Sequence, residues 1–431
     1  MKVAFSTLGC RVNQYETEAM SEKFIKQGYD IVQFNELADV YVINTCTVTN
    51  MGDRKSRQMI SRARRENENA IIAVVGCYSQ IAPEEVSSIE GVDVVLGTRN
   101  KGDVVYWVHR AMEEKEKIIE VKDVLKNKTF EELNIEEYQD RTRAFLKVQD
   151  GCNRFCSYCL IPFARGAVCS KDPSKVIEEV RKLANHGFKE IILSGIDIAS
   201  YGVDLNENWD LLLLLKELDK IEGVTRIRIG SIDPTFFKDN IIEGIGKLKK
   251  LCPHFHLSLQ SGCNETLKRM NRKYTVEQYK YIVSSLRERI KGVSITTDII
   301  VGFPGETEEE FEKTYNFLSD IKLSKMHVFK FSPRKGTRAA KMDNQIDGKI
   351  KEKRSSKLIK LDKIQEKEFI NKFIGQSMSV LYEKLSKQDG YYEGYTPNYI
   401  KVLSNCENDI SGNIVETCIE KSDQEFAYGK I

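Results

Sequence analysis

Apolar and polar positions follow two different periods in the first 115 residues. Short apolar runs predict strands at 2–7, 41–44, 71–75 and 92–96. Apolar residues that recur every three or four positions predict helices at 14–27, 53–66 and 103–115. Strands that alternate with helices are typical of a parallel sheet covered on both faces. The pattern therefore predicts an α/β fold that begins with a doubly wound domain over residues 1–115.

The alternation resumes at residue 143 and gives six further β/α units. Their strands are expected at 143–149, 189–194, 224–230, 254–259, 293–301 and 325–332. Asp172 before Pro173 is a helix N-cap signal, and Thr307 with Glu310 forms the pattern of a capping box. A closed barrel of this kind has eight strands. Six units therefore predict a partial (β/α)6 barrel within a central domain, residues 142–370.

Two other segments complete the predicted organisation. Residues 116–141 carry many charges and little periodicity, so we interpret them as a linker. A helix rich in Lys and Arg is expected at 345–372. Short apolar runs separated by glycines then predict a small β-barrel domain over residues 371–431.

The composition narrows the class of protein. The 431 residues are 41% hydrophobic and 30% charged, with a net charge of +2, so a basic surface for nucleic acid must be local. The sequence has no apolar run of about 18 residues, and it starts without a signal-peptide pattern. We expect a cytoplasmic protein without membrane contact, because its 11 cysteines have no spacing typical of disulfides.

Three cysteines, Cys152, Cys156 and Cys159, lie in the run GCNRFCSYC. Closely spaced cysteines ligate iron–sulfur clusters. Three thiolates on a 4Fe–4S cluster leave its fourth iron open to a small molecule, and an open position is typical of a reactive metal site. A structural zinc site and chance clustering are the alternatives, although structural zinc needs a fourth ligand.

A second set of cysteines follows predicted strands: Cys10 in STLGC, Cys46 in VINTC and Cys77 in VVGC. The carboxyl ends of parallel strands share one edge of a sheet, and ligands bind in the crevice there. These three cysteines are therefore expected to converge and to hold a second open cluster. Burial as small apolar residues is the alternative.

The two cysteine sets and the small β domain together resemble the methylthiotransferases, a family of radical S-adenosylmethionine (SAM) enzymes, along the whole chain. The resemblance implies an auxiliary 4Fe–4S cluster on the strand-end cysteines and a catalytic, SAM-binding 4Fe–4S cluster on GCNRFCSYC. It also implies that the last domain is an RNA-binding TRAM domain. In this family a 5′-deoxyadenosyl radical takes hydrogen from carbon 2 of an adenine, and a methylthio group is delivered there.

Within this family, the stretches TLGCRVNQYETEAM, CNRFCSYCLIPFARG and SLQSGCNETLKRMNRKYT are most similar to the branch that acts on threonylcarbamoyladenosine in the anticodon loop of tRNA. The resemblance implies a donor of electrons such as flavodoxin or ferredoxin and leaves the sulfur donor open. Methylthiolation of isopentenyladenosine and a non-catalytic iron–sulfur RNA-binding regulator are the alternatives. One departure is that Ala167, Val168 and Cys169 stand where the family usually has arginines.

Six residues are expected to contact SAM. Tyr158 precedes the last cysteine of the clustered set, and the others follow barrel strands, where the functional residues of barrels gather. The six residues are Tyr158, Gly195, Ser231, Asp233, Gln260 and Asp298. A structural role is the alternative for each of them.

Two local signals predict contacts with RNA. The basic run DRKSRQMISRARR follows Cys46, and GYYEGYTPNYIKV interleaves tyrosines with a lysine. Aromatic rings stack on bases and cations meet phosphates in small RNA-binding β modules. The expected RNA-binding residues are Arg54, Lys55, Arg57, Tyr395, Tyr399 and Lys401. A solvated helix face and a tyrosine-rich core are the alternatives.

Overall fold

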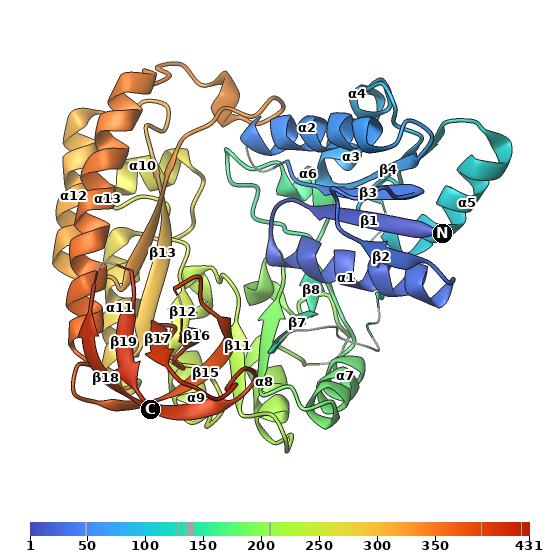
Figure 1. Ribbon diagram of the computed structural model, residues 1–431. Helices are drawn as coiled ribbons and strands as arrows, with labels where there is room; N and C mark the ends of the chain where they lie inside the picture. Colours follow the sequence, from blue (N-terminus) through green and yellow to red (C-terminus); the bar gives the residue numbers. More distant parts are fainter. Residues whose placement is uncertain are drawn as a thin grey trace.

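The computed structural model in Figure 1 has a blue N-terminal sheet domain, a central barrel and a red C-terminal barrel of strands. The structure describes residues 1–47, 50–126, 129–133, 135, 142–206, 208–388, 390–423 and 425–431. Among the helices of these residues, none combines the length and apolar character of a membrane span.

The N-terminal domain is built on a six-stranded parallel sheet with the order β2-β1-β3-β4-β5-β6. Its strands are β1 Lys2–Thr7, β2 Asp30–Val32, β3 Val40–Thr45, β4 Ile71–Gly76, β5 Val94–Leu96 and β6 Ile118–Glu120. One face packs against α1 (Arg11–Lys26) and α5 (Val104–Glu114). The other face packs against α2 (Asn50–Glu66), α3 (Cys77–Ile81) and α4 (Pro83–Ser87). The predicted doubly wound sheet is confirmed.

The segment predicted to be a linker is partly structured. Its residues Ile118–Glu120 form β6 and pair with β5, so the linker prediction is wrong there. A three-residue edge strand is too short to show a period of its own. Leu133 and Ile135 are buried in the core of the central domain, and Leu133 accepts a hydrogen bond from Tyr15 of α1. Residues 127–128, 134 and 136–141 lie outside the described residues.

The central domain has six parallel barrel strands, as predicted. They are β7 Arg143–Lys147, β10 Glu190–Ser194, β11 Arg226–Ile229, β12 His254–His256, β13 Ser294–Val301 and β14 Lys325–Lys330. They form two three-stranded sheets that meet through parallel bridges between β11 and β12 segments, with β7 and β14 at the edges. The outer helices are α7 Pro173–Asn185, α8 Leu211–Asp219, α9 Asp239–Gly246, α11 Val276–Arg289 and α12 Glu308–Ile321. The partial (β/α)6 barrel is therefore confirmed.

The local signals at two helix starts are also confirmed. The Asp172 side chain accepts hydrogen bonds from the backbone of Ser174 and Lys175, with Pro173 in the first turn. Thr307 and Glu310 form both halves of a capping box at the start of α12. These caps satisfy amides that a helix start leaves unpaired.

The chain leaves the barrel through α13 (Gly348–Asn371), which packs on β14, and then forms a closed β-barrel. Its strands are β15 Ser377–Leu385, β16 Tyr391–Tyr395, β17 Lys401–Asn405, β18 Ile414–Ser422 and β19 Ala427–Lys430. The predicted small β-barrel is confirmed. It docks against the amino-terminal ends of the central strands, where Arg226 donates to the Tyr395 carbonyl at 3.0 Å.

His254 in this docking interface predicts a dependence of stability on pH. Its ring stacks on Tyr399 with centroids 4.7 Å apart, and burial, aided by Arg228, lowers the pKa of His254 well below its usual value of 6.5. Below about pH 6.5 the unfolded chain therefore binds more protons than the folded chain. The contribution of His254 to stability is complete above that pH and is lost as the pH falls. The slope is about 1.4 kcal/mol per pH unit for one proton.

We therefore expect Tm to fall less between pH 7.5 and 5.5 in His254→Phe, which keeps the ring stack, than in the parent chain. His186 at the end of α7 is exposed, so His186→Gln is the control and should retain the parent's dependence. Identical pH profiles for His254→Phe and the parent would contradict this assignment.

Candidate functional site

A cavity of about 360 Å³ lies between the central barrel and the N-terminal domain. Cys152, Cys156 and Cys159 line it from the barrel side, and Cys10 lines it from the side of the N-terminal sheet. The remaining lining comes mainly from segments that follow barrel strands. Such positions are where barrels carry their functional groups.

The clustered cysteines lie in a loop between β8 (Gln149–Asp150) and α6 (Ile161–Arg165). Gly151 starts this loop with a φ of 72°, and a Cβ there would lie 1.9 Å from the carbonyl oxygen of Ala167. Only glycine fits this close approach. The Cys152 amide donates to the Gly166 carbonyl at 3.0 Å, which holds the loop against the segment after α6.

The burial of these sulfurs favours the neutral thiol unless a cation is bound beside them. Burial, with Asp197 as the next cause, raises the pKa of Cys152 to about 12, and burial raises the pKa of Cys159 to about 12. Arg272 Nη1 lies 3.2 Å from the Cys156 sulfur and can donate to a thiolate. Buried thiolates of this kind need bound cations as partners. Three sulfurs around one cavity thus provide an appropriate donor set for iron.

An ion-pair network borders the same cavity. Arg154 Nε lies 2.8 Å from Asp197, and Arg154 Nη1 lies 3.1 Å from Asp233. Arg272 Nη2 reaches Asp233 at 2.8 Å. Sequence reasoning named Asp233 but missed Arg154, Asp197 and Arg272. Two of these residues could have been found from the sequence. Arg154 lies inside the cysteine motif, and Asp197 lies just after a predicted strand.

Five of the six residues predicted to contact SAM line this cavity: Tyr158, Gly195, Ser231, Asp233 and Gln260. Asp298 is not among the lining residues, and its predicted contact with SAM stays a prediction. Its carboxylate lies 3.3 Å from His256 Nε2, because Asp298 shares a face of the sheet with Thr296, the strand partner of His256. Gln260 has a φ of 70°, a strained conformation for a residue other than glycine, and such strain is common at functional sites.

The strand-end cysteines approach one another at the carboxyl edge of the N-terminal sheet. Cys46 follows β3, Cys77 begins α3 directly after β4, and Cys10 precedes α1. A Cβ on Gly9 would lie 2.9 Å from the Cys46 sulfur, and the Cys10 and Cys77 thiols interact electrostatically. Cys77 also interacts with Cys159 of the clustered set. The two sets therefore adjoin, and their role as cluster ligands stays a prediction.

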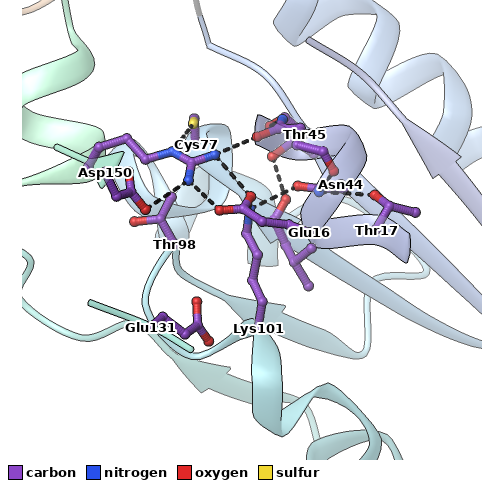
Figure 2. A network of polar contacts seen from close by, with 12 residues as sticks. Glu16, Thr17, Asn44, Thr45, Cys77, Thr98, Lys101, Glu131 and Asp150 are labelled. Carbon is purple, nitrogen blue, oxygen red and sulfur yellow. Dashed lines mark hydrogen bonds and ion pairs between the residues drawn. The ribbon is translucent and has the colours of Figure 1, made fainter. Parts of the chain in front are cut away.

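Figure 2 shows a polar network around Glu16, Cys77 and Asp150. Arg165 joins this network and connects the two domains beside Cys77. Its Nε lies 3.4 Å from the Cys77 sulfur, and its other donors reach Asn13, Glu16 and Asp150 at 2.5 to 3.3 Å. The sequence carried no signal for this contact, because Arg165 lies next to the other cysteine set.

A second arginine accounts for the departure from the family pattern after α6. Arg99 of the N-terminal domain donates to the sulfur of buried Cys169 at 2.8 Å. It also donates to the Arg165 carbonyl at 2.7 Å. The position that usually carries arginine in the family is therefore approached by an arginine from the other domain.

The residues predicted to bind RNA fall into two groups. Arg54, Lys55 and Arg57 are exposed on α2, where Arg57 also contacts the Tyr78 hydroxyl at 2.8 Å. Together with Arg62 and Arg65 they form a cationic face of α2 that is exposed to solvent.

Two residues of the second group lie in the docking interface. Tyr395 and Tyr399 stack on each other, and Arg228 lies 4.5 Å from the Tyr399 ring centre. Their half-buried rings thus contact protein side chains at the docking interface, and their contact with RNA stays a prediction. Lys401 forms an ion pair with Glu393 at 2.9 Å. The two tyrosines also take part in packing between two domains, which a local sequence pattern does not reveal.

Comparisons with known proteins agree with this architecture. A family model described as "Radical SAM superfamily" matches residues 146–318, which implies a 4Fe–4S cluster and SAM as cofactors. A second one, described as "Uncharacterized protein family UPF0004", matches residues 2–97. The radical S-adenosylmethionine methyltransferase TsrM from Kitasatospora setae has a similar fold, with a TM-score of 0.59 at 14% identity over 79% of this chain and 77% of that chain.

Curated relatives extend over nearly the whole chain. The threonylcarbamoyladenosine tRNA methylthiotransferase MtaB of Bacillus subtilis (strain 168) is 44% identical over 99% of this chain and 96% of the relative. MtaB of Aquifex aeolicus is 44% identical over 88% of this chain and 92% of the relative. A tRNA-2-methylthio-N(6)-dimethylallyladenosine synthase of Alkaliphilus oremlandii is 39% identical over 90% of this chain and 83% of the relative. The chain therefore belongs to the radical SAM methylthiotransferase family.

Proposed function

We propose that this protein is a tRNA methylthiotransferase that converts threonylcarbamoyladenosine, next to the anticodon, to its 2-methylthio derivative. The observation that carries the proposal is one cavity lined by the three clustered cysteines and by Cys10 of the strand-end set. The choice of nucleoside rests on relatives named for threonylcarbamoyladenosine, which are 44% identical to this chain, against 39% for a relative named for dimethylallyladenosine.

The proposal assigns two 4Fe–4S clusters to the two cysteine sets. Cys152, Cys156 and Cys159 would hold the SAM-binding cluster, and Cys10, Cys46 and Cys77 would hold the auxiliary cluster. When bound, these groups supply one-electron reduction of SAM and a carrier for sulfur. Cys10 on the wall of the same cavity supports short passage from one site to the other.

The polypeptide would bind and orient the substrates. Asp197 and Asp233 offer carboxylates to the polar groups of SAM, while Arg154 holds both carboxylates in place. Gly195 packs closely on Gln149 at the cavity wall, since a Cβ there would lie 2.8 Å from Gln149 Oε1. The low exposure of Asp197 and Asp233 keeps their charges poorly screened and effective in orientation.

The tRNA would lie across α2. Arg54, Lys55 and Arg57 supply cations for phosphates beside Cys46, and Arg62 and Arg65 extend this face along the helix. The anticodon loop exposes unstacked bases, which suits a site that must reach the edge of one adenine. An electron donor of the flavodoxin or ferredoxin class would serve the enzyme, and its sulfur donor is not assigned.

Mass spectrometry of tRNA nucleosides tests the proposed nucleoside. We expect a strain that lacks the gene to lose 2-methylthio-threonylcarbamoyladenosine and to accumulate the unthiolated nucleoside. Plasmid-borne parent chain should restore the product, and the Cys156→Ala chain should not. Loss of the 2-methylthio form of isopentenyladenosine instead would favour the other branch. Reconstituted protein that makes no 5′-deoxyadenosine with reductant and SAM would favour a non-catalytic regulator.

A further inference from the structure

Arg165 of the central domain reaches into the N-terminal domain, where it joins a buried polar network around Glu16 and Cys77. Figure 2 shows other members of this network, among them Lys101 and Asp150. Its Nε donates to the Cys77 sulfur at 3.4 Å. Its Nη1 donates to Glu16 at 2.5 Å and to Asp150 at 3.3 Å. Its Nη2 donates to Asn13 at 2.5 Å and to Glu16 at 3.0 Å. All five donors of the guanidinium are thus directed, which fixes its plane and the position of Nε.

The surrounding charges leave a positive surplus beside Cys77. The basic side chains of the network are Lys101, Lys147, Arg99 and Arg165, and the carboxylates are Glu16, Asp150 and Glu131. Against the opposing effect of burial, Arg165 and the two lysines hold the pKa of Glu16 well below its usual value. Four basic side chains thus face at most three carboxylates, and the side chains that form the ion pairs are buried.

An unbalanced buried cation is costly unless an anion accompanies it. Arg165 donates to two carboxylates, to Asn13 and to the sulfur of Cys77. The sulfur is thus the remaining acceptor that could carry a further negative charge. Thiolates on an iron–sulfur cluster carry negative charge, which increases when the cluster is reduced. The positive surplus and the N–H donor therefore match a thiolate ligand at Cys77 and favour the reduced state.

We infer that Arg165 is a positioning residue that orients the Cys77 thiolate and raises the reduction potential of the auxiliary cluster from the opposite domain. The inference rests on the proposed function, because that function assigns a cluster to Cys10, Cys46 and Cys77. Hydrogen bonds to sulfur and nearby charge are recognised determinants of cluster potential. Arg165 follows Cys159 by six positions, so one short segment serves both sites.

The test uses the full chain with a single cluster. Cys152, Cys156 and Cys159 are replaced by alanine, the protein is reconstituted anaerobically, and the midpoint potential is measured by EPR-monitored titration. We expect Arg165→Gln in this background to shift the midpoint to a more negative potential. Arg99→Gln is the matched control, because Arg99 is equally buried and faces Asp150 at 3.8 Å but contacts Cys169 instead of Cys77. Its shift should be clearly smaller.

An unchanged midpoint in Arg165→Gln, or an equal shift in Arg99→Gln, would overturn the inference while leaving the proposed function intact. A single-cluster parent that binds no iron and sulfide would instead remove the auxiliary cluster, and both proposals with it. If Arg165→Gln does not fold, Arg165→Lys and Arg99→Lys decide the question. Both keep the charge, and the inference requires a shift only in Arg165→Lys, which loses the fixed Nε contact.

Discussion

Replacing Cys46 with alanine is expected to leave SAM cleavage measurable while it lowers methylthio transfer by more than about 100-fold. Loss of an outer partner of a metal ligand alone costs about 10- to 100-fold, so loss of a ligand should cost more. Cys46 follows β3 on the N-terminal sheet, whereas the sulfurs assigned to SAM cleavage lie on the loop before α6. The two half-reactions should therefore separate at this residue.

The measurement is 5′-deoxyadenosine and 2-methylthio nucleoside from the same anaerobic reaction. Cys156→Ala is the opposite variant and should abolish both products, because it removes a ligand of the cluster that reduces SAM. Cys406→Ala in the β-barrel domain is the control for loss of any thiol, and it should keep both products. Normal nucleoside yield from Cys46→Ala would refute an auxiliary cluster at this position.

Replacing Glu190 with alanine is expected to destabilise the protein by about 3–5 kcal/mol, the usual cost when one partner of a buried charge cluster is removed. Glu190 is fully buried at the foot of β10 and lies 2.8 Å from Arg228 and 3.6 Å from Arg226. Although burial opposes ionisation, Arg228 and the neighbouring arginines lower the pKa of Glu190. Without the carboxylate, these arginines repel one another.

The same substitution should loosen the β-barrel domain. Arg228 donates to the Pro397 carbonyl at 3.0 Å and Arg226 to the Ser379 carbonyl at 2.8 Å, so both arginines carry the docking interface. We expect faster proteolysis between α13 and β15 together with a lower Tm. Glu243→Gln is the control, because Glu243 forms an exposed pair with Lys247 that contributes little. Equal stability of the Glu190→Ala and Glu243→Gln proteins would contradict this account.

The period of apolar residues predicted strands and helices best where buried positions recur regularly along the chain. Most strands of the central barrel pack on helices, so their apolar runs are long enough to recognise. The signals at Asp172 and Thr307 are local hydrogen bonds, and local chemistry is readable without the fold. The strand β6 escaped notice because it has only three residues at the edge of its sheet.

Contacts between domains were not visible in the local sequence pattern. Tyr395 and Tyr399 carry a composition that fits base stacking, yet Arg228 and His254 lie against Tyr399, and Arg143 lies against Tyr395. Arg165 stands six positions after Cys159 and donates to Cys77, 88 positions away. The spacing of residues along the chain says nothing about such a contact, because it depends on how the two domains dock.

The sequence by itself determined the αβ repeats, the helix caps and the two cysteine sets, since these depend on neighbouring residues and on the shared edge of parallel strands. Only the tertiary structure decided that Cys10 shares one cavity with the clustered set, that Asp298 pairs with His256, and that Arg165 reaches Cys77. The physical reason is that these relations arise from the docking of separate bodies. Buried charges must find partners across that interface, and their partners lie far away in sequence.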